Sequence, residues 1–233
     1  MNRLFFGMAL LGAAVLSSCS GNKNQQAEEN VETTEAQVKP EFLRLNAMVT
    51  LDPANSPKVI ELAKTLIQAS LSDKGVMEYD MYKSETRDNK LLIYETWADQ
   101  PSLDAHSASD HFTSIVPQIV ELGEMGIDQF EQVANPETAG KQIRINCRVV
   151  AKEGKKDDII KAAKELVAAS LNDKGVIEYD IMSSVTRPNE LLIYETWADQ
   201  PSLDAHSASD HFTRLVPQIQ EMSESMTIQQ YYK

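Results

Sequence analysis

The stretch LLIYETWADQPSLDAHSASDHFT occupies residues 91–113, and the same letters return unchanged at residues 191–213. All four histidines and both tryptophans of the chain lie inside these two blocks. A verbatim repeat at an offset of 100 residues, with no insertion needed to align the copies, indicates one structural unit built twice. The repeat marks where chemistry should be sought, although a tightly packed corner of the fold or local gene conversion would preserve the same letters.

Each copy predicts the same order of elements. Apolar residues at 43, 45, 47 and 49 alternate with Arg44, Asn46 and Met48, which is the period-two pattern of a strand. Apolar residues then return at helical spacing from residue 56 until Gly75 closes the helix. Strands are expected over 76–84 and 91–98, a short helix from residue 99, another helix over about 111–121, and a last strand near 127–133.

This order of elements is that of a ferredoxin-like α+β unit. Such a unit packs its helices against one face of its sheet and leaves the other face needing cover. Because both copies lie on one chain with a short connection, each can cover the sheet of the other. We therefore expect two tandem ferredoxin-like repeats, residues 41–135 and 141–233, that form an intramolecular pseudo-dimer; further oligomerisation is left open.

Residues 1–18 have the pattern of an export signal. An early Arg precedes an apolar run too short to serve comfortably as a spanning helix, and small residues follow it. The run Leu16-Ser17-Ser18-Cys19 resembles the lipobox of bacterial lipoproteins, in which the cysteine becomes lipidated; an ordinary secretory signal is the alternative. Residues 19–40 hold few large apolar side chains and are expected to form a flexible tether. We expect a protein of the cell envelope, lipid-anchored on the periplasmic or outer-membrane face.

The charge balance limits the partners. Removing residues 1–18 leaves 21 basic residues (22 − 1) against 35 acidic ones. This excess argues against nucleic acid and against a basic membrane-binding surface, so membrane contact is expected through the N-terminal lipid only. Cys147 has no partner for an internal disulfide and is expected to be a small buried hydrophobe on a strand.

A family resemblance follows from the runs YETW (94–97), LDAH (103–106) and SDHF (109–112) after GVMEY (75–79). Their order, which recurs through Phe212, resembles the antibiotic biosynthesis monooxygenase family. The resemblance implies a dimeric α/β barrel with a pocket between sheet and helices in each half. Some members oxidise quinols or polyketide phenols with O₂ and no cofactor, some degrade haem, and others isomerise sugar phosphates. The fold therefore follows more firmly than the function.

Departures from the family pattern narrow the resemblance. Ile93 and Leu103 stand where the polyketide oxygenases have Asn and Tyr. In haem-degrading members a helical Trp and His would fall at His106 and Val116, so that pair is missing and Asn46 alone agrees. The small quinol monooxygenases, which share the Glu-x-Trp and Ala-His pattern, are the closest remaining resemblance.

Cofactor-free oxidation of a phenol or quinol needs a base, a dry apolar cavity and donors that hold the anion. Histidine is the natural base near neutral pH. The catalytic candidates are His106, His111, His206 and His211. The substrate-binding candidates are Asn46, Tyr94, Trp97, Asn146, Tyr194 and Trp197. Each also has a plain structural interpretation, as a core aromatic, a helix cap or a group that satisfies the backbone.

The expected function is that of a cofactor-independent monooxygenase that oxidises a quinol or polyphenolic aromatic with O₂ outside the cytoplasm. The alternative is a non-catalytic, lipid-anchored module that binds a small ligand on the same barrel. No cofactor is expected under either hypothesis. Oxygen consumption with a reduced quinone would discriminate between the two hypotheses.

A metal site is not expected. On a continuous helix, five residues place His106 and His111 about 140° apart, so the two rings would not share a face. They also lack the four-residue spacing of paired zinc ligands. A break at residues 107–109 would bring them closer. Outside the verbatim block, Arg148 replaces Met48 and is expected to face solvent on a sheet edge; if it pointed into a cavity, the second half would favour an anionic ligand.

Overall fold

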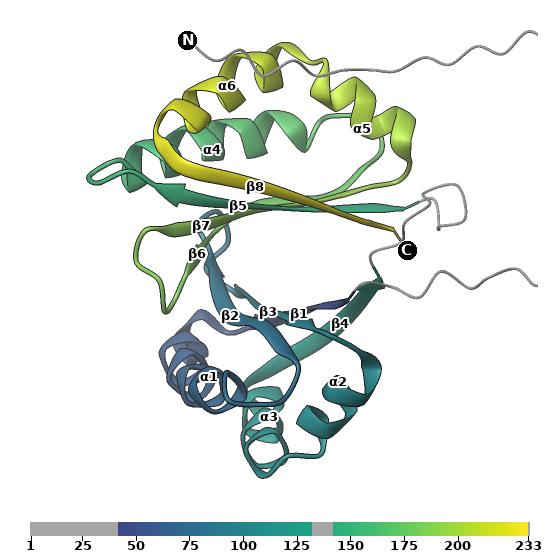
Figure 1. The fold of residues 1–233 in the computed structure, drawn as a ribbon. Helices are drawn as coiled ribbons and strands as arrows, with labels where there is room; N and C mark the ends of the chain where they lie inside the picture. The colour runs from purple at the N-terminus through teal and green to yellow at the C-terminus, as the bar shows by residue number, and fades with distance from the viewer. Residues whose placement is uncertain (1–41, 132–141, 233) are drawn as a thin grey trace, which may run out of the picture. The chain divides into compact units, whose positions relative to one another are not determined.

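The computed structural model describes residues 42–131 and 142–232 (Figure 1). The expected signal segment 1–18 and tether 19–40, with Cys19, lie outside the described residues, as do the outer bounds of both repeats. Within the described ranges, no helix has the length and apolar character needed to cross a bilayer.

The two repeats fold alike and confirm the predicted order of elements. The first contains β1 (Leu43–Leu51), the 3₁₀ turn η1 (Pro53–Asn55), α1 (Ser56–Ser70), β2 (Val76–Ser84), β3 (Lys90–Trp97), α2 (Gln100–Ser107), α3 (Asp110–Leu122) and β4 (Gly123–Glu131). The second contains β5 (Ile143–Ala151), α4 (Lys156–Ser170), β6 (Val176–Ser184), β7 (Glu190–Trp197), α5 (Gln200–Ser207), α6 (Asp210–Glu221) and β8 (Ser223–Tyr232).

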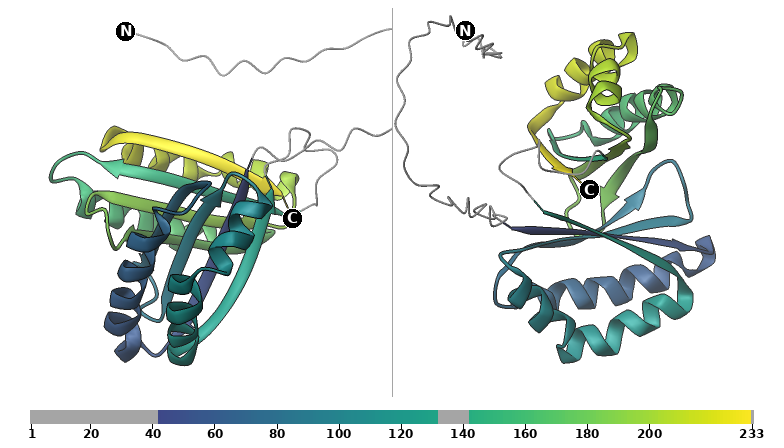
Figure 2. Two further views of the ribbon diagram at one scale, coloured as in Figure 1. Left: turned by 60° about the horizontal axis from the view of Figure 1, so that its bottom comes forward. Right: turned by 90° about the vertical axis from the view of Figure 1, so that its right-hand side faces the viewer.

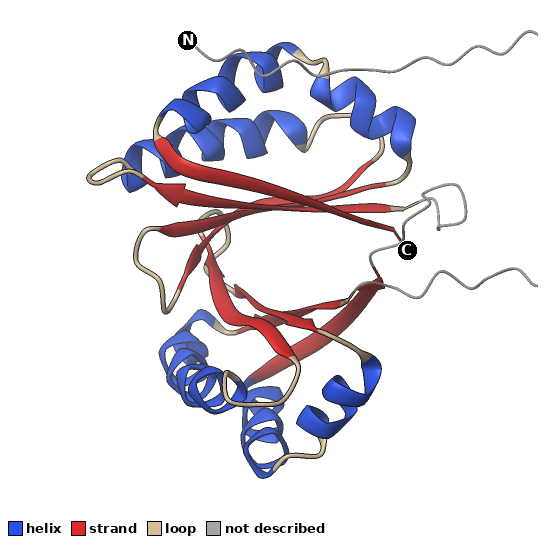
Figure 3. Cartoon of the chain, in the orientation of Figure 1, coloured by secondary structure: helices blue, strands red, loops and turns tan. Residues whose placement is uncertain are grey.

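The strands close into one antiparallel barrel in the order β1-β3-β2-β6-β7-β5-β8-β4. The repeats meet where Tyr82 of β2 pairs with Ser184 of β6, and where Glu131 of β4 pairs with Tyr232 of β8. Figures 1 and 2 show the helices of each repeat on the outer side of its own strands, and Figure 3 separates the same layers by colour. The predicted pseudo-dimer of two α+β repeats is confirmed.

The alternation along each strand divides the side chains between two cores. One set, which includes Leu45 and Val49, packs beneath the helices, and an equivalent core fills the second repeat. The other set points into the barrel, where Tyr82 and Tyr94 join their counterparts in a smaller apolar cluster. A residue on a strand is therefore assigned to the helix side or to the barrel interior by its position in the alternation.

The corner between α1 and β2 requires glycine. Gly75 has φ of 83°, and a Cβ placed on it would lie 2.1 Å from the Oγ of Ser102. Asp99 starts α2 by accepting hydrogen bonds from the backbone N of Ser102 at 2.9 Å and from its Oγ at 2.6 Å. The close approach of Ser102 to Gly75 places α2, which carries His106, beside the α1–β2 corner.

The helical segment is interrupted between α2 and α3. Ser109 has an extended backbone and caps α3, its Oγ accepting a 3.3 Å hydrogen bond from the backbone N of Phe112. His106 therefore lies in the last turn of one helix and His111 in the first turn of the next. The angle expected for a continuous helix does not apply to this pair.

The last strand of each repeat differs from the expectation. β4 begins at Gly123, directly after α3, rather than near residue 127. In the second repeat Ala151 pairs with Ser223 and Val150 with Ser225, so Glu224 is an extra residue in a β-bulge. The expectation of an alignment without insertion is wrong from this point onward.

Arg148 does not lie on a sheet edge, because β5 is paired on both sides within the closed barrel. Its guanidinium is 2.7 Å from the carboxylate of Glu78 in the first repeat, and its side chain is 39% exposed. The predicted edge position is wrong because barrel closure leaves β5 without a free edge. This ion pair joins the two repeats.

Candidate active site

A cavity of about 270 Å³ lies between the sheet and the helices of the first repeat. Its inner wall is apolar, whereas exposed polar side chains contribute to its rim. The apolar lining includes Leu45, Ala47, Ile93, Leu103, Phe112 and Val116. The rim includes Gln100, Asp104 and Gln129. The cavity lies where the family resemblance places a pocket.

Glu95 is the buried carboxylate of this cavity. It lies on β3, and its Oε2 accepts a 2.7 Å hydrogen bond from the indole Nε1 of Trp97. Burial disfavours the charged form and raises the pKa of Glu95 to about 7, although the Trp97 hydrogen bond acts in the opposite direction. Glu195 and Trp197 reproduce both the hydrogen bond and the raised pKa. Such a carboxyl group can accept and return a proton near neutral pH.

His106 lies behind the cavity wall rather than in it. Its buried ring packs against the indole of Trp97, with 4.6 Å between the ring centroids. Its Nδ1 is 2.7 Å from Oδ2 of Asp73, whereas its buried Nε2 has no hydrogen-bond partner. In the second repeat the matching Nε2 lies 3.9 Å from the carboxylate of Glu195. Burial lowers the pKa of His106, and the neighbouring Asp73 partly opposes this shift.

His111 reaches the same carboxylate from α3. Its Nε2 is 2.9 Å from Oδ2 of Asp73, and its ring centroid is 5.5 Å from that of His106. The second repeat has the same arrangement, with Asp173 contacting both His206 and His211. The helix break therefore brings together two predicted histidines that the sequence alone did not place on one face.

These clusters are the described groups most suited to a metal ion. Asp73, His106 and His111 each offer one ligand atom, and the three atoms lie within 4.8 Å of one another. The corresponding three residues of the second repeat meet the same condition. Two imidazoles and one carboxylate form a donor set that divalent transition metals accept.

The predicted residues Asn46 and Tyr94 lie on the other face of the sheet. The side-chain amide of Asn46 is 3.5 Å from that of Asn146 across the barrel. The ring of Tyr94 is covered by the guanidinium of Arg44 at 3.6 Å, and Tyr194 is covered in the same way. These side chains do not line the 270 Å³ cavity, because the strand alternation directs them into the barrel.

Sequence reasoning missed Asp73 and Glu95 as functional candidates. Glu95 stands two residues before Trp97, so the period of the strand already places both side chains on one face. Asp73 precedes Gly75 in a turn, and nothing in that pattern links it to histidines more than thirty residues away. The sequence pattern could therefore have identified Glu95, whereas Asp73 could be recognised only from the folded structure.

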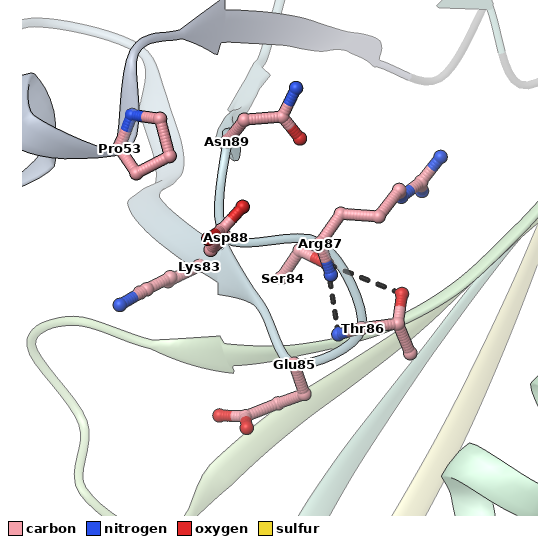
Figure 4. A pocket seen from close by; sticks show the side chains of 8 residues that line it. All are labelled: Pro53, Lys83, Ser84, Glu85, Thr86, Arg87, Asp88 and Asn89. Atoms are coloured by element: carbon pink, nitrogen blue, oxygen red, sulfur yellow. Dashed lines mark hydrogen bonds between the residues drawn. The ribbon is translucent and has the colours of Figure 1, made fainter.

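A second hollow surrounds the turn between β2 and β3 (Figure 4). The Oγ of Ser84 accepts hydrogen bonds from the backbone N of Thr86 at 3.2 Å and of Arg87 at 2.9 Å. The guanidinium of Arg87 is in turn 2.7 Å from the buried carboxylate of Asp180 in the other repeat. We assign this hollow to the junction between the repeats rather than to catalysis.

Comparison with known proteins identifies the same two segments. The family profile described as antibiotic biosynthesis monooxygenase matches residues 42–118 and 143–218. Each match includes one complete copy of the verbatim block and every strand of its repeat except the last one.

Three relatives each match less than half of the chain. An uncharacterized protein of Synechocystis is 31% identical over 74 residues, which is 32% of this chain and 50% of that protein. YcnE of Bacillus subtilis, provisionally named as a monooxygenase, is 26% identical over 78 residues, or 34% of this chain and 82% of YcnE. The crystal structure of a Bacteroides thetaiotaomicron protein of unknown function is described as that of a possible oxidoreductase. That protein is 38% identical to this chain, and the match covers 40% of this chain and 100% of the Bacteroides chain, with a TM-score of 0.39. The chain thus spans half the length of the Synechocystis relative.

Proposed function

The chain belongs to the antibiotic biosynthesis monooxygenase family, and on that premise we propose that it oxidises a small quinol or polyphenolic aromatic with O₂ and without a cofactor. The observation that carries this proposal is the apolar cavity between sheet and helices with the Glu95 carboxyl group in its wall. It combines two of the elements that the reaction needs from the protein, an apolar environment and a group that exchanges a proton.

The cavity volume limits the size of the substrate. An apolar cavity of about 150 Å³ is enough to hold a benzene molecule. A volume of about 270 Å³ therefore suits an aromatic of one or two rings and is small for a polycyclic polyketide. The proposed substrate class is the smaller quinols, in agreement with the departures at Ile93 and Leu103.

In the proposed reaction Glu95, in its ionised form, accepts the proton of a bound quinol hydroxyl. The quinolate passes an electron to O₂, and combination of the resulting radicals forms a carbon–oxygen bond. Glu95 returns its proton to the peroxide, which loses water and leaves a hydroxyquinone. One oxygen atom enters the substrate and the other leaves as water. The substrate supplies all four electrons, so no separate reductant is required.

The neighbours of Glu95 give it a defined position. The indole of Trp97 occupies Oε2, which leaves Oε1 as the oxygen available to a substrate hydroxyl. The ring of His106 packs against the indole of Trp97, and His106 is not among the residues that line the cavity. The four histidines were the candidates for the base, and the proposal moves this role to Glu95 and Glu195. His106, His111, His206 and His211 then act as positioning residues.

The experiment is oxygen uptake by the full chain with reduced benzoquinones and naphthoquinones under ¹⁸O₂. We expect one labelled oxygen atom in the organic product and one in water. Glu95→Gln combined with Glu195→Gln should lower turnover by about 10²- to 10⁴-fold, the range for loss of a general base. The matched control, Glu121→Gln with Glu221→Gln, changes exposed carboxylates that do not line the cavity and should retain turnover.

Two outcomes would overturn the assignment. Full turnover in the double glutamine variant would exclude Glu95 and Glu195 as the base. Tight binding of a quinol by the wild-type chain without any oxygen uptake would instead favour the non-catalytic binding module.

The cell-envelope location stays a proposal on the sequence alone. The run Leu16-Ser17-Ser18-Cys19 supports lipidation of Cys19, which would anchor the chain without a transmembrane helix. Metabolic labelling with a fatty acid should label the wild-type chain and leave Cys19→Ser unlabelled and outside the membrane fraction. Equal labelling of both proteins would refute this location.

A further inference from the structure

We propose that each repeat binds one divalent transition-metal ion, through Asp73, His106 and His111 in the first repeat. The second site consists of Asp173, His206 and His211. The proposal concerns ion binding and does not rest on the proposed oxidation of a quinol.

The ligand atoms converge from three separate elements. Nδ1 of His106, at the end of α2, is 2.7 Å from Oδ2 of Asp73, and Nε2 of His111, at the start of α3, is 2.9 Å from the same oxygen. In the second repeat the corresponding distances are 2.8 and 3.0 Å. The helix break at residues 108–109 is what directs both rings toward one carboxylate.

The spacing fits an ion after a small adjustment. Zinc-type ions bind nitrogen and oxygen ligands at about 2.0–2.2 Å, so tetrahedral neighbours are about 3.3 Å apart. The carboxylate of Asp73 therefore has to withdraw by about half an ångström to admit the ion. Asp73 lies in the turn after α1, and its side chain is 21% exposed. The side chain can therefore make this movement without disturbing the core.

The buried Nε2 of His106 gives an independent reason for an ion. Without one, the hydrogen bond from Nδ1 to Asp73 leaves Nε2 as an unpartnered acceptor on the side of the ring where Glu195 approaches the matching histidine at 3.9 Å. An ion on Nδ1 moves the proton to Nε2, and in the second repeat the N–H of His206 then faces the carboxylate of Glu195. Metal-bound histidines commonly make this contact with their second nitrogen.

The site is closed on the protein side and open toward solvent. The side chain of His106 is fully buried, whereas those of His111 and Asp73 are 22% and 21% exposed. Two imidazoles and one carboxylate leave coordination positions that water can fill, which is the arrangement suited to zinc, cobalt(II) or iron(II). The ion would lie on the Nδ1 side of His106, and the cavity is lined by other residues.

The test uses the chelator-treated full chain and the metal alone. Titration with Co²⁺, followed by its visible absorption, and with Zn²⁺, followed by calorimetry, should each give two ions per chain. His111→Ala should bind one ion, and His111→Ala with His211→Ala should bind none. The control Asp110→Asn with Asp210→Asn changes an exposed acid beside each histidine and should still bind two ions.

X-ray absorption of the zinc-loaded wild-type chain gives a second measurement that needs no variant. We expect two imidazole ligands per ion, with oxygen ligands completing the coordination. The proposal is overturned if the wild-type chain binds no ion, if the double histidine variant still binds two, or if the spectrum shows sulfur instead of imidazole. None of these measurements involves O₂ or a quinol, so their failure leaves the proposed oxidation untouched.

Discussion

The indole nitrogen of Trp97 donates a 2.7 Å hydrogen bond to Glu95, and both side chains point from β3 toward the helices. Trp197 and Glu195 repeat the contact at the same distance. The bond retains a carboxyl group in an apolar core, where burial disfavours its charged form. Stability and the protonation of this group are therefore linked.

We expect Glu95 to lower the stability of the fold as pH rises. Its pKa is about 7 in the folded chain against an ordinary value of 4.5, so folding retains the proton. Its stabilising contribution is complete below about pH 4.5 and is lost as pH rises to about 7. The difference between the two pKa values (7 − 4.5) corresponds to about 3 kcal/mol.

The measurement is urea unfolding of the wild-type chain and of Glu95→Gln, in the presence of chelator, at about pH 5 and pH 8. The variant should gain stability relative to the wild type at the higher pH. A stability difference that is the same at both pH values would contradict the raised pKa.

The sequence predicted the elements of each repeat well because most of its signals are local. The strand alternation at residues 43–49 and Gly75 each act within a few residues, and the structure has a strand and a turn there. The two-residue period of β3 also places Glu95 and Trp97 on the same face of the strand. These features required no knowledge of long-range contacts.

The remaining features depend on contacts between distant parts of the chain. Asp73 contacts His111 because α1, α2 and α3 pack together. The spacing of the two residues along the sequence does not predict this contact. The bulge at Glu224 and the pairing of Arg148 with Glu78 follow from closing a barrel out of two repeats that have diverged. Sequence reasoning on one repeat at a time could not include them.

The junction between the repeats should depend on Asp180. Its side chain is fully buried and accepts hydrogen bonds from Arg87 at 2.7 Å and from Thr86. Asp180→Ala leaves both donors without this acceptor, so we expect a loss of about 2–4 kcal/mol in the free energy of unfolding. The exposed pair of Glu165 and Arg214 is the control, and Glu165→Ala should cost less than about 1 kcal/mol. Equal losses in denaturant unfolding would show that Asp180 does not hold the junction.

Cys147 should be chemically inert in the native chain. Burial raises its pKa to about 12, so the thiol stays protonated at neutral pH and cannot act as a thiolate nucleophile. In a Cys19→Ser background, an aromatic disulfide reagent should label Cys147 at the rate of unfolding, and rapidly in denaturant. Fast labelling of the folded chain would place the thiol at the surface.

Gly75, in the α1–β2 corner, can be compared with Gly154, which lies between β5 and α4. Gly75 and Gly154 both have positive φ, 83° and 71°, so replacing either one by alanine introduces backbone strain of about 1–2 kcal/mol. A Cβ at Gly154 would meet no atom within 4 Å, whereas one at Gly75 would lie 2.1 Å from Oγ and 2.5 Å from Cβ of Ser102. Gly75→Ala should therefore cost more, by about 1–3 kcal/mol, because α2 has to move away from the corner.

Denaturant unfolding of Gly75→Ala and Gly154→Ala measures this difference directly. Adding Ser102→Gly to Gly75→Ala removes the atoms that collide and should restore the part of the stability that exceeds backbone strain, measured against Ser102→Gly alone. If the two alanine variants are equally stable, α2 does not pack against Gly75 as closely as the structure shows. Because α2 carries His106, a shift at this corner should also weaken the contact of that ring with Asp73, which the imidazole NMR resonances would report.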